Sequence, residues 1–255
     1  MILFFGWFTL FKDMRLVLYF FLPFMWCFAH EPTIGFCIVA TGKYIDFTPP
    51  LIESAEKYFC RGTPKRYFVF SDRTSELPKN AEIIEVRHFS WPFSTAMRNT
   101  FYVLHKERLK ECDYLFAIDA DMRFVSPIAK EEVLGTLVAT QHPGFYRMRG
   151  SYESNSISKA FVAPNEGEYY FCGGFFGGKR EEFIKLCQKT SDNFFEDLKK
   201  GFIAEWHDES HHNRYLIDYP PTKILSPAYC YPESWKLPFE KKLLALDKNH
   251  AEFQK

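Results

Sequence analysis

Two acidic residues directly after an apolar run are the clearest chemical feature of the sequence. Asp119 and Asp121 follow residues 114–118, YLFAI, a run that predicts a buried strand. Acids at positions i and i+2 can both reach one hard cation there, because the chain leaves strand geometry at the end of the run. The pair predicts a Mn²⁺ or Mg²⁺ site that bridges a diphosphate, and the alternative is a solvated turn with two acids.

A second cluster, WHDESHH at 206–212, combines histidines with acids. His207 and His211 are four residues apart, a spacing that can hold zinc on a helix, but the hydrolase pattern H-E-x-x-H needs Glu where Asp208 stands. Asp208 is also a good residue for capping the start of a helix. A zinc hydrolase and a simple helix start therefore both remain open at this point.

The glycine-rich segment 173–180, GGFFGGKR, nearly matches the phosphate-binding pattern G-x-x-x-x-G-K-[ST]. Arg180 replaces the hydroxyl residue of that pattern, and Phe175 and Phe176 are bulky where the loop must wrap a phosphate. We therefore expect glycines that let a substrate approach the backbone, with the phenylalanines anchored in the core.

The elements that must position these residues alternate along the chain. Apolar runs predict strands, and helical spacing predicts helices between them. We expect strands at 34–40, 66–71, 81–86 and 114–118 and helices at 51–59, 95–111 and 179–201. A long functional loop is expected at 143–167, followed by a strand with a glycine-rich turn over 168–178. The tail from Pro220 is expected to be irregular. This order predicts an α/β fold with a largely parallel sheet, whose ligands bind beyond the carboxyl ends of the strands.

Composition narrows the class of protein. The chain has 255 residues, of which 47% are apolar, and this length and composition predict one main domain. Because 32 Lys and Arg balance 32 Asp and Glu, the sequence lacks the basic character of a nucleic-acid-binding protein, and we expect no nucleic-acid partner. Arg98, Lys248 and Lys255 would ordinarily be surface charges unless a diphosphate lies nearby. The seven cysteines include no C-x-x-C pair, which favours free, buried thiols and leaves one or two disulfides open.

Residues 1–29 differ from the rest of the chain. Lys12 and Arg15 precede an uncharged run over 16–29, which is shorter than the roughly 17 to 25 residues of a spanning helix. A cleaved signal, a short signal-anchor and a terminal helix packed on the domain all fit. We therefore divide the chain into an apolar signal-like segment at 1–29 and a catalytic domain at 30–255.

Six motifs, in order, resemble the α-1,3-galactosyl and N-acetylgalactosaminyl transferase family, the family of the histo-blood-group A and B enzymes. They are DYLFAIDADMRF at 113–124, HPGFY at 142–146, YYFCGGFFGG at 169–178, WHDESHHNRY at 206–215, PTKILSP at 221–227 and DKNH at 247–250. The resemblance implies a GT-A fold with a mixed, mostly parallel sheet. It also implies retaining transfer of GalNAc or Gal from a UDP-sugar, in α-1,3 linkage, to a galactose-terminated glycan or glycolipid.

The resemblance implies a role for each matching residue. Glu209 matches the catalytic carboxylate, and Asp119 and Asp121 match the ligands of Mn²⁺, with Mg²⁺ possible. Donor binding is implied for Val39, Thr41, Tyr44, Arg98, Asp119, Cys172, Gly173, Gly174, His207, Asp208 and Lys248, and acceptor binding for His142, Trp206 and Glu209. The chemistry agrees, because a metal and Lys248 neutralise the leaving UDP while an anion stabilises an oxocarbenium-like sugar.

Some features depart from the family or stay open. The basic segment that the family carries after a tyrosine is YESNSIS here, at 152–158, and Gln254 stands where the family has an arginine. The resemblance places Gly174 at a position that discriminates between donors, where a small residue accompanies GalNAc, so it implies a preference for UDP-GalNAc over UDP-Gal. We expect membrane association through the first segment, in the Golgi for a eukaryotic protein and at the cytoplasmic face of the inner membrane for a bacterial one. A zinc hydrolase and a non-catalytic galactoside-binding module remain the alternatives.

Overall fold

The computed structural model describes residues 30–249. The predicted signal-like segment at 1–29, Gln254 and Lys255 lie outside the described residues. Within 30–249, no helix combines the length and the apolar character needed to cross a bilayer.

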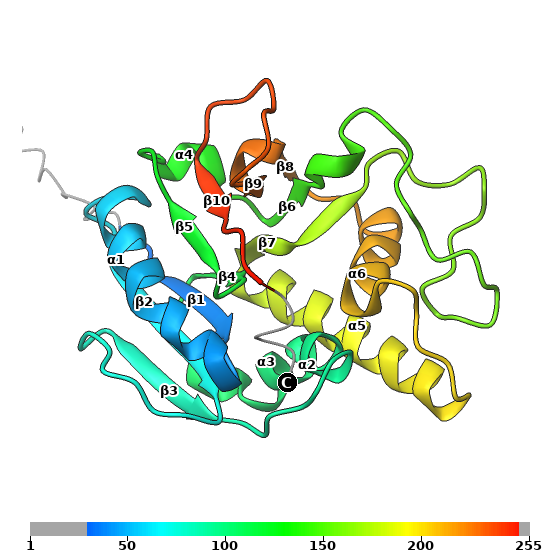
Figure 1. The fold of residues 1–255 in the computed structure, drawn as a ribbon, viewed down its shortest axis with the longest axis horizontal. Coiled ribbons are helices and arrows are strands. Elements are labelled where there is room, and N and C mark those ends of the chain that lie inside the picture. The colour runs from blue at the N-terminus through cyan, green and yellow to red at the C-terminus, as the bar shows by residue number, and fades with distance from the viewer. Residues whose placement is uncertain (1–29, 250–255) are drawn as a thin grey trace, which may run out of the picture. The chain divides into compact units, whose positions relative to one another are not determined.

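A seven-stranded sheet with the order β3-β2-β1-β4-β7-β6-β8 forms the centre of the described domain (Figure 1). Its strands are β1 (Ile34–Val39), β2 (Lys65–Ser71), β3 (Ala81–Glu85), β4 (Tyr114–Ile118), β6 (Leu137–Gln141), β7 (Phe171–Lys179) and β8 (Lys223–Leu225). Strands β1 to β4 are parallel to one another, whereas β7 runs antiparallel to both β4 and β6. The prediction of an α/β fold with a mixed, mostly parallel sheet is confirmed, and the arrangement is consistent with a GT-A fold.

Helices cover both faces of this sheet (Figure 1). The helices are α1 (Thr48–Tyr58), α2 (Phe93–Ala96), α3 (Arg98–Leu104), α4 (Lys130–Val133), α5 (Arg180–Lys199) and α6 (His207–Asp218). One core forms between α1 and the sheet, and a second between the sheet and helices α3, α5 and α6. Strand β1 is apolar throughout because it is buried on both faces, as parallel strands usually are.

A small second sheet places the C-terminal part of the described chain beside the acidic pair. It consists of β5 (Met122–Phe124), β10 (Leu243–Ala245) and β9 (Tyr231–Pro232), with β10 in the middle. The tail from Pro220, which we expected to be irregular, therefore contains three short strands.

Two local predictions are wrong. The single helix expected at 95–111 is divided into α2, α3 and a 3-10 turn, because Met97 and His105 leave regular helical geometry. The glycines of 173–178 do not form a turn but lie inside strand β7. A Cβ at Gly177 would stand 2.3 Å from the carbonyl oxygen of Leu115, so this strand can approach β4 closely only with glycine there.

Candidate active site

The acidic pair lies at the carboxyl end of β4, as predicted. The backbone N–H of Asp119 donates to the carbonyl oxygen of Gly174 at 3.0 Å, and the N–H of Leu246 donates to that of Asp121 at 2.9 Å. Strand β7 and the residue that follows β10 therefore fix the turn between the two acids. Both carboxylates face the same cavity.

Arg98, at the start of α3, joins three segments beneath this turn. Its guanidinium donates to Asp119, to Asp208 on α6 and to the carbonyl oxygen of Gly173, the last at 2.9 Å. Burial lowers the pKa of Arg98, but the carboxylates of Asp208 and Asp119 raise it overall, so the group stays charged. Arg98 is only 7% exposed, so it is not an ordinary surface charge.

Asp208 is not a helix cap. It lies within the first turn of α6, its side chain is 3% exposed, and it accepts hydrogen bonds from Arg98. At the start of the helix, the hydroxyl of Ser210 instead accepts from the backbone N–H of Trp206 at 3.0 Å. The interpretation of Asp208 as a simple helix start is therefore wrong, and its charge belongs to the site.

Lys248 supplies the second cation of the site. Its ammonium group pairs with the Asp121 carboxylate and lies 5.4 Å from the centre of the Tyr44 ring. Burial lowers the pKa of Lys248, and Asp119 opposes this effect. Lys248 therefore places a positive charge next to Asp121.

The two carboxylates do not form a complete metal centre by themselves. Among residues 30–249, no group of three or more His, Cys, Asp or Glu side chains is arranged to hold an ion. A hard divalent cation at Asp119 and Asp121 would need further oxygen ligands, and a diphosphate supplies them. The chemistry of this donor set fits a metal shared between protein and substrate.

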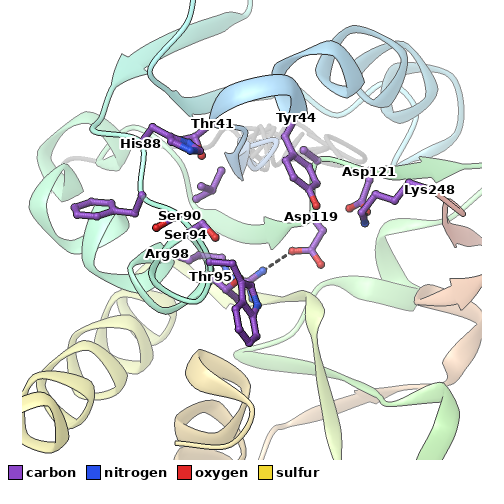
Figure 2. A pocket seen from close by; sticks show the side chains of 14 residues that line it. Thr41, Tyr44, His88, Ser90, Ser94, Thr95, Arg98, Asp119, Asp121 and Lys248 are labelled. Carbon is purple, nitrogen blue, oxygen red and sulfur yellow. Dashed lines mark hydrogen bonds and ion pairs between the residues drawn. The ribbon is translucent and has the colours of Figure 1, made fainter. Parts of the chain in front are cut away.

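The cavity in front of the acids brings together most of the predicted donor-site residues (Figure 2). Val39, Thr41 and Tyr44 follow or end β1 and lie in the same cavity as Arg98, Asp119, Asp121 and Lys248. Sequence reasoning missed the segment 88–95, which supplies His88, Phe89, Ser90, Trp91, Ser94 and Thr95. No motif marks this segment, which reaches the cavity only because it follows β3 and leads into α2.

Glu209 lies next to Asp208 at the start of α6. The backbone N–H of Gly173 donates to its carboxylate at 2.8 Å. Burial raises the pKa of Glu209 to about 7, while this hydrogen bond and the facing Tyr170 hydroxyl act in the opposite direction. Gly173 therefore holds Arg98 through its carbonyl and Glu209 through its N–H, which links the cationic and the anionic parts of the site.

Of the residues predicted to bind an acceptor, His142 lies at the start of the long loop, just before the turn at Pro143–Phe145. The Nδ1 atom of His142 accepts from the backbone N–H of Gly144 at 3.1 Å, and burial lowers the pKa of His142 to about 4, so its ring is neutral. Trp206 is 46% exposed. Trp235, which sequence reasoning missed, is equally exposed and lies beside Gly144. Both indoles can therefore meet an incoming ligand.

The remaining sequence candidates have different positions. Cys172 is buried in β7 beside Cys230 and does not line the donor cavity. His207 packs against Trp91 with ring centroids 5.0 Å apart. The six cysteines in the described part of the chain are free and buried, as expected.

His211 lies apart from His207, with different neighbours. Its ring is fully buried against Phe194, and its Nε2 is 3.7 Å from the buried carboxylate of Asp197. Burial lowers the pKa of His211 to about 4. These surroundings do not favour the zinc-hydrolase alternative.

Two buried carboxylates hold the loop at 143–167. Asp197 on α5 accepts from the hydroxyl of Ser158 at 2.5 Å and from the backbone N–H of Lys159 at 2.7 Å. Glu153 accepts from the N–H of Asn155 at 2.7 Å and from that of Glu205 at 2.8 Å. The segment YESNSIS is therefore tied to α5 and to the residue that precedes Trp206.

Comparison with known proteins gives consistent matches. Residues 25–255 match the family described as glycosyltransferase family 6. The chain is 36% identical over 235 residues to histo-blood group ABO system transferase 1 of Rattus norvegicus, covering 86% of this chain and 67% of that protein. It is 36% identical over 225 residues to globoside alpha-1,3-N-acetylgalactosaminyltransferase 1 of Canis lupus familiaris, covering 83% and 65%. The O-antigen biosynthesis glycosyltransferase WbnI of Escherichia coli is 29% identical over 223 residues, covering 84% of this chain and 94% of that protein.

Proposed function

This chain belongs to glycosyltransferase family 6, and from that premise we propose that it transfers GalNAc, or galactose, from a UDP-sugar to the 3-hydroxyl of a galactose-terminated acceptor with retention of configuration. The observation that carries the proposal is the arrangement around Gly173. There the carbonyl of one residue accepts from Arg98, the cation that pairs with Asp119, and the N–H of the same residue donates to the carboxylate of Glu209.

The donor is expected to bind with its uracil end near Val39, Thr41 and Tyr44 and its diphosphate near Asp119 and Asp121. Mn²⁺, or Mg²⁺ in its place, supplies charge neutralisation for the leaving diphosphate when it is bound at the two acids. Lys248 can also neutralise negative charge on the diphosphate, because its ammonium group already lies at Asp121. Arg98 holds Asp119 and Asp208 in place, and its charge opposes the rise that burial causes in the pKa of Asp208.

Glu209 is the residue that we assign to the sugar itself. As the bond to UDP breaks, positive charge develops on the anomeric carbon, and a nearby carboxylate stabilises it. The N–H of Gly173 fixes the orientation of that carboxylate. His142 and Trp206 would place the acceptor galactose against it. Because Nδ1 of the neutral His142 ring accepts from Gly144, its Nε2–H can donate a hydrogen bond to a hydroxyl group.

The glycine at 174 guides the choice of donor. A Cβ there would lie 3.2 Å from Asp119 Oδ2, Cys230 Sγ and Met122 Cε, so a methyl group would press against the carboxylate of Asp119. Because the resemblance assigns Gly174 to the position that discriminates between donors, and a small residue there accompanies GalNAc, we favour UDP-GalNAc as the donor. We also propose that residues 1–29 attach the chain to a membrane. Fractionation of cells that express the full chain tests this attachment.

The experiment that tests the function is transfer from a panel of UDP-sugars. UDP-GalNAc, UDP-Gal, UDP-GlcNAc and UDP-Glc are each offered with a galactose-terminated disaccharide, with and without Mn²⁺, and the linkage of the product is assigned by NMR. Formation of an α-1,3-linked product from UDP-GalNAc or UDP-Gal supports the proposal. Release of UDP without transfer to the acceptor would contradict the proposal. Binding of the acceptor without affinity for UDP would also contradict it and would favour the galactoside-binding alternative.

A further inference from the structure

A second cavity lies outside the donor site, next to the start of the long loop. Residues 145–149 and 167–169 line it, together with Gln141 at the end of β6 and Ile224 on β8. Three of its lining residues are among the large apolar side chains that remain exposed in the described domain: Met148 at 59%, Tyr169 at 38% and Ile224 at 41%. A cluster of exposed apolar groups around one hollow indicates a binding surface.

The cavity is not uniformly apolar. The side chains of Arg147, Arg149, Glu168 and Gln141 share its lining with the apolar groups. Aromatic faces with a few polar groups at the edge suit a ligand whose rings carry both C–H faces and hydroxyl groups. An acyl chain would leave these charged groups facing hydrocarbon, and the carboxylate of Glu168 opposes a purely anionic ligand. The lining is therefore best matched to a sugar.

The backbone at Arg147 is an independent sign of a functional role. Arg147 has a backbone φ of 60°, in the left-handed region that residues other than glycine, asparagine and aspartate seldom adopt. Its guanidinium lies 5.1 Å from the centre of the Tyr146 ring. Strained residues persist where a ligand site benefits from them, and here the strain presents a cation–aromatic pair to the cavity.

One aromatic ring separates this cavity from the predicted acceptor contact. Phe145 lines the cavity, and its ring centre is 5.0 Å from that of His142 and 5.0 Å from that of Tyr170, whose hydroxyl faces Glu209. An oligosaccharide that places its terminal galactose at His142 can therefore continue past Phe145 into the cavity.

We propose that this cavity binds the inner sugars of the acceptor, so that the natural substrate is an oligosaccharide longer than a disaccharide. The proposal rests on the proposed function, because it assigns His142 to the terminal galactose. Tyr169 and Tyr146 would pack against sugar rings, and Gln141, Arg147 and Glu168 would bind their hydroxyl groups.

The test compares a galactose-terminated disaccharide with a tetrasaccharide that ends in the same disaccharide. The variants are Tyr169→Ala, which removes an exposed ring, and Arg147→Gly, which removes the cation and suits the positive φ. Tyr219→Ala is the matched control, because Tyr219 is exposed but lines neither cavity. For the unmodified chain, we expect a kcat/KM about tenfold higher for the tetrasaccharide, equivalent to about 1.4 kcal/mol.

Each variant at the cavity should remove most of this advantage and leave the disaccharide KM and the UDP-sugar KM unchanged, whereas the control should keep it. Equal kcat/KM for both acceptors, or an advantage that survives both variants, overturns the proposal. If neither acceptor is a substrate, the proposed function fails. The cavity is then judged by saturation-transfer NMR with the tetrasaccharide alone, where loss of signal in Tyr169→Ala supports a sugar site and absence of signal in the unmodified chain excludes one.

Discussion

Replacing Glu153 by Gln should weaken acceptor binding without touching the donor site. Glu153 is 4% exposed, and its two carboxylate oxygens each accept one backbone N–H, from Asn155 and from Glu205. The second bond fixes the residue before Trp206, the exposed indole assigned to the acceptor. Glu153 thus acts as a positioning residue for Trp206.

The size of the effect follows from these bonds. In the Glu153→Gln variant, the remaining side-chain oxygen still accepts one backbone N–H. The new NH₂ group faces the other backbone N–H and cannot accept from it, so one charge-assisted hydrogen bond is lost. Such a bond contributes about 1.5 to 3 kcal/mol, which corresponds to a factor of about 10 to 150 in the population of the anchored loop. We expect the KM for the acceptor to rise by about tenfold or more. The KM for the UDP-sugar should stay within about twofold, because α3 and β4 hold the donor side.

The assay measures both KM values and kcat by UDP release, with Glu205→Gln as the control. Glu205 is exposed and next to Trp206, and the same chemical change there leaves both anchoring bonds in place. Thermal unfolding shows whether the variants remain folded. An equal rise in both KM values, or an acceptor KM that matches the control in a folded Glu153→Gln protein, would refute the positioning role.

Three further changes test the donor side. Asp121→Asn should lower activity by orders of magnitude and abolish tight Mn²⁺ binding measured by EPR, and full turnover in EDTA would rule out the metal. Glu209→Gln should reduce kcat at least about 100-fold with little change in UDP-sugar affinity. In the unmodified chain kcat/KM should fall as the pH drops through about 7, because the carboxylate needed as an anion becomes protonated there; a flat profile between pH 6 and 8 would contradict this. Gly174→Ala should shift the donor ratio towards UDP-Gal by about 1 to 3 kcal/mol, checked by competition at equal concentrations, and an unmodified chain that prefers UDP-Gal would show that another residue sets the choice.

The parts of the site that the sequence predicted correctly are those encoded locally. The acidic pair directly follows an apolar strand, and a strand that ends at a turn must leave such residues at its carboxyl end. The pattern at 34–40 likewise predicts a buried strand, which places Val39 and Thr41 at the same edge. The six-motif resemblance assigned roles to residues that no local pattern distinguishes.

The parts that failed depend on partners far away in the sequence. The glycines of 173–178 suggest a turn when read alone. They form a strand because β4 and β6 lie on either side, and the tight approach at Gly177 needs the missing side chain. Arg98 has the surroundings of a surface residue in the sequence, and its burial is explained by distant partners, Asp119, the carbonyl of Gly173 and Asp208, the last 110 positions later.

The charges around Arg98 explain why these distant residues must meet. Asp119, Asp121, Asp208 and Glu209 are four carboxylates in one site, and Arg98 and Lys248 are the two cations that face them. A divalent cation alone would neutralise this excess of negative charge, whereas a diphosphate alone would deepen it. The nucleotide sugar is therefore expected to bind together with the metal and not before it. Arg98 is central to this balance because it opposes the rise that burial causes in the pKa of Asp208, and because it binds one oxygen of Asp119 and leaves the other for the metal.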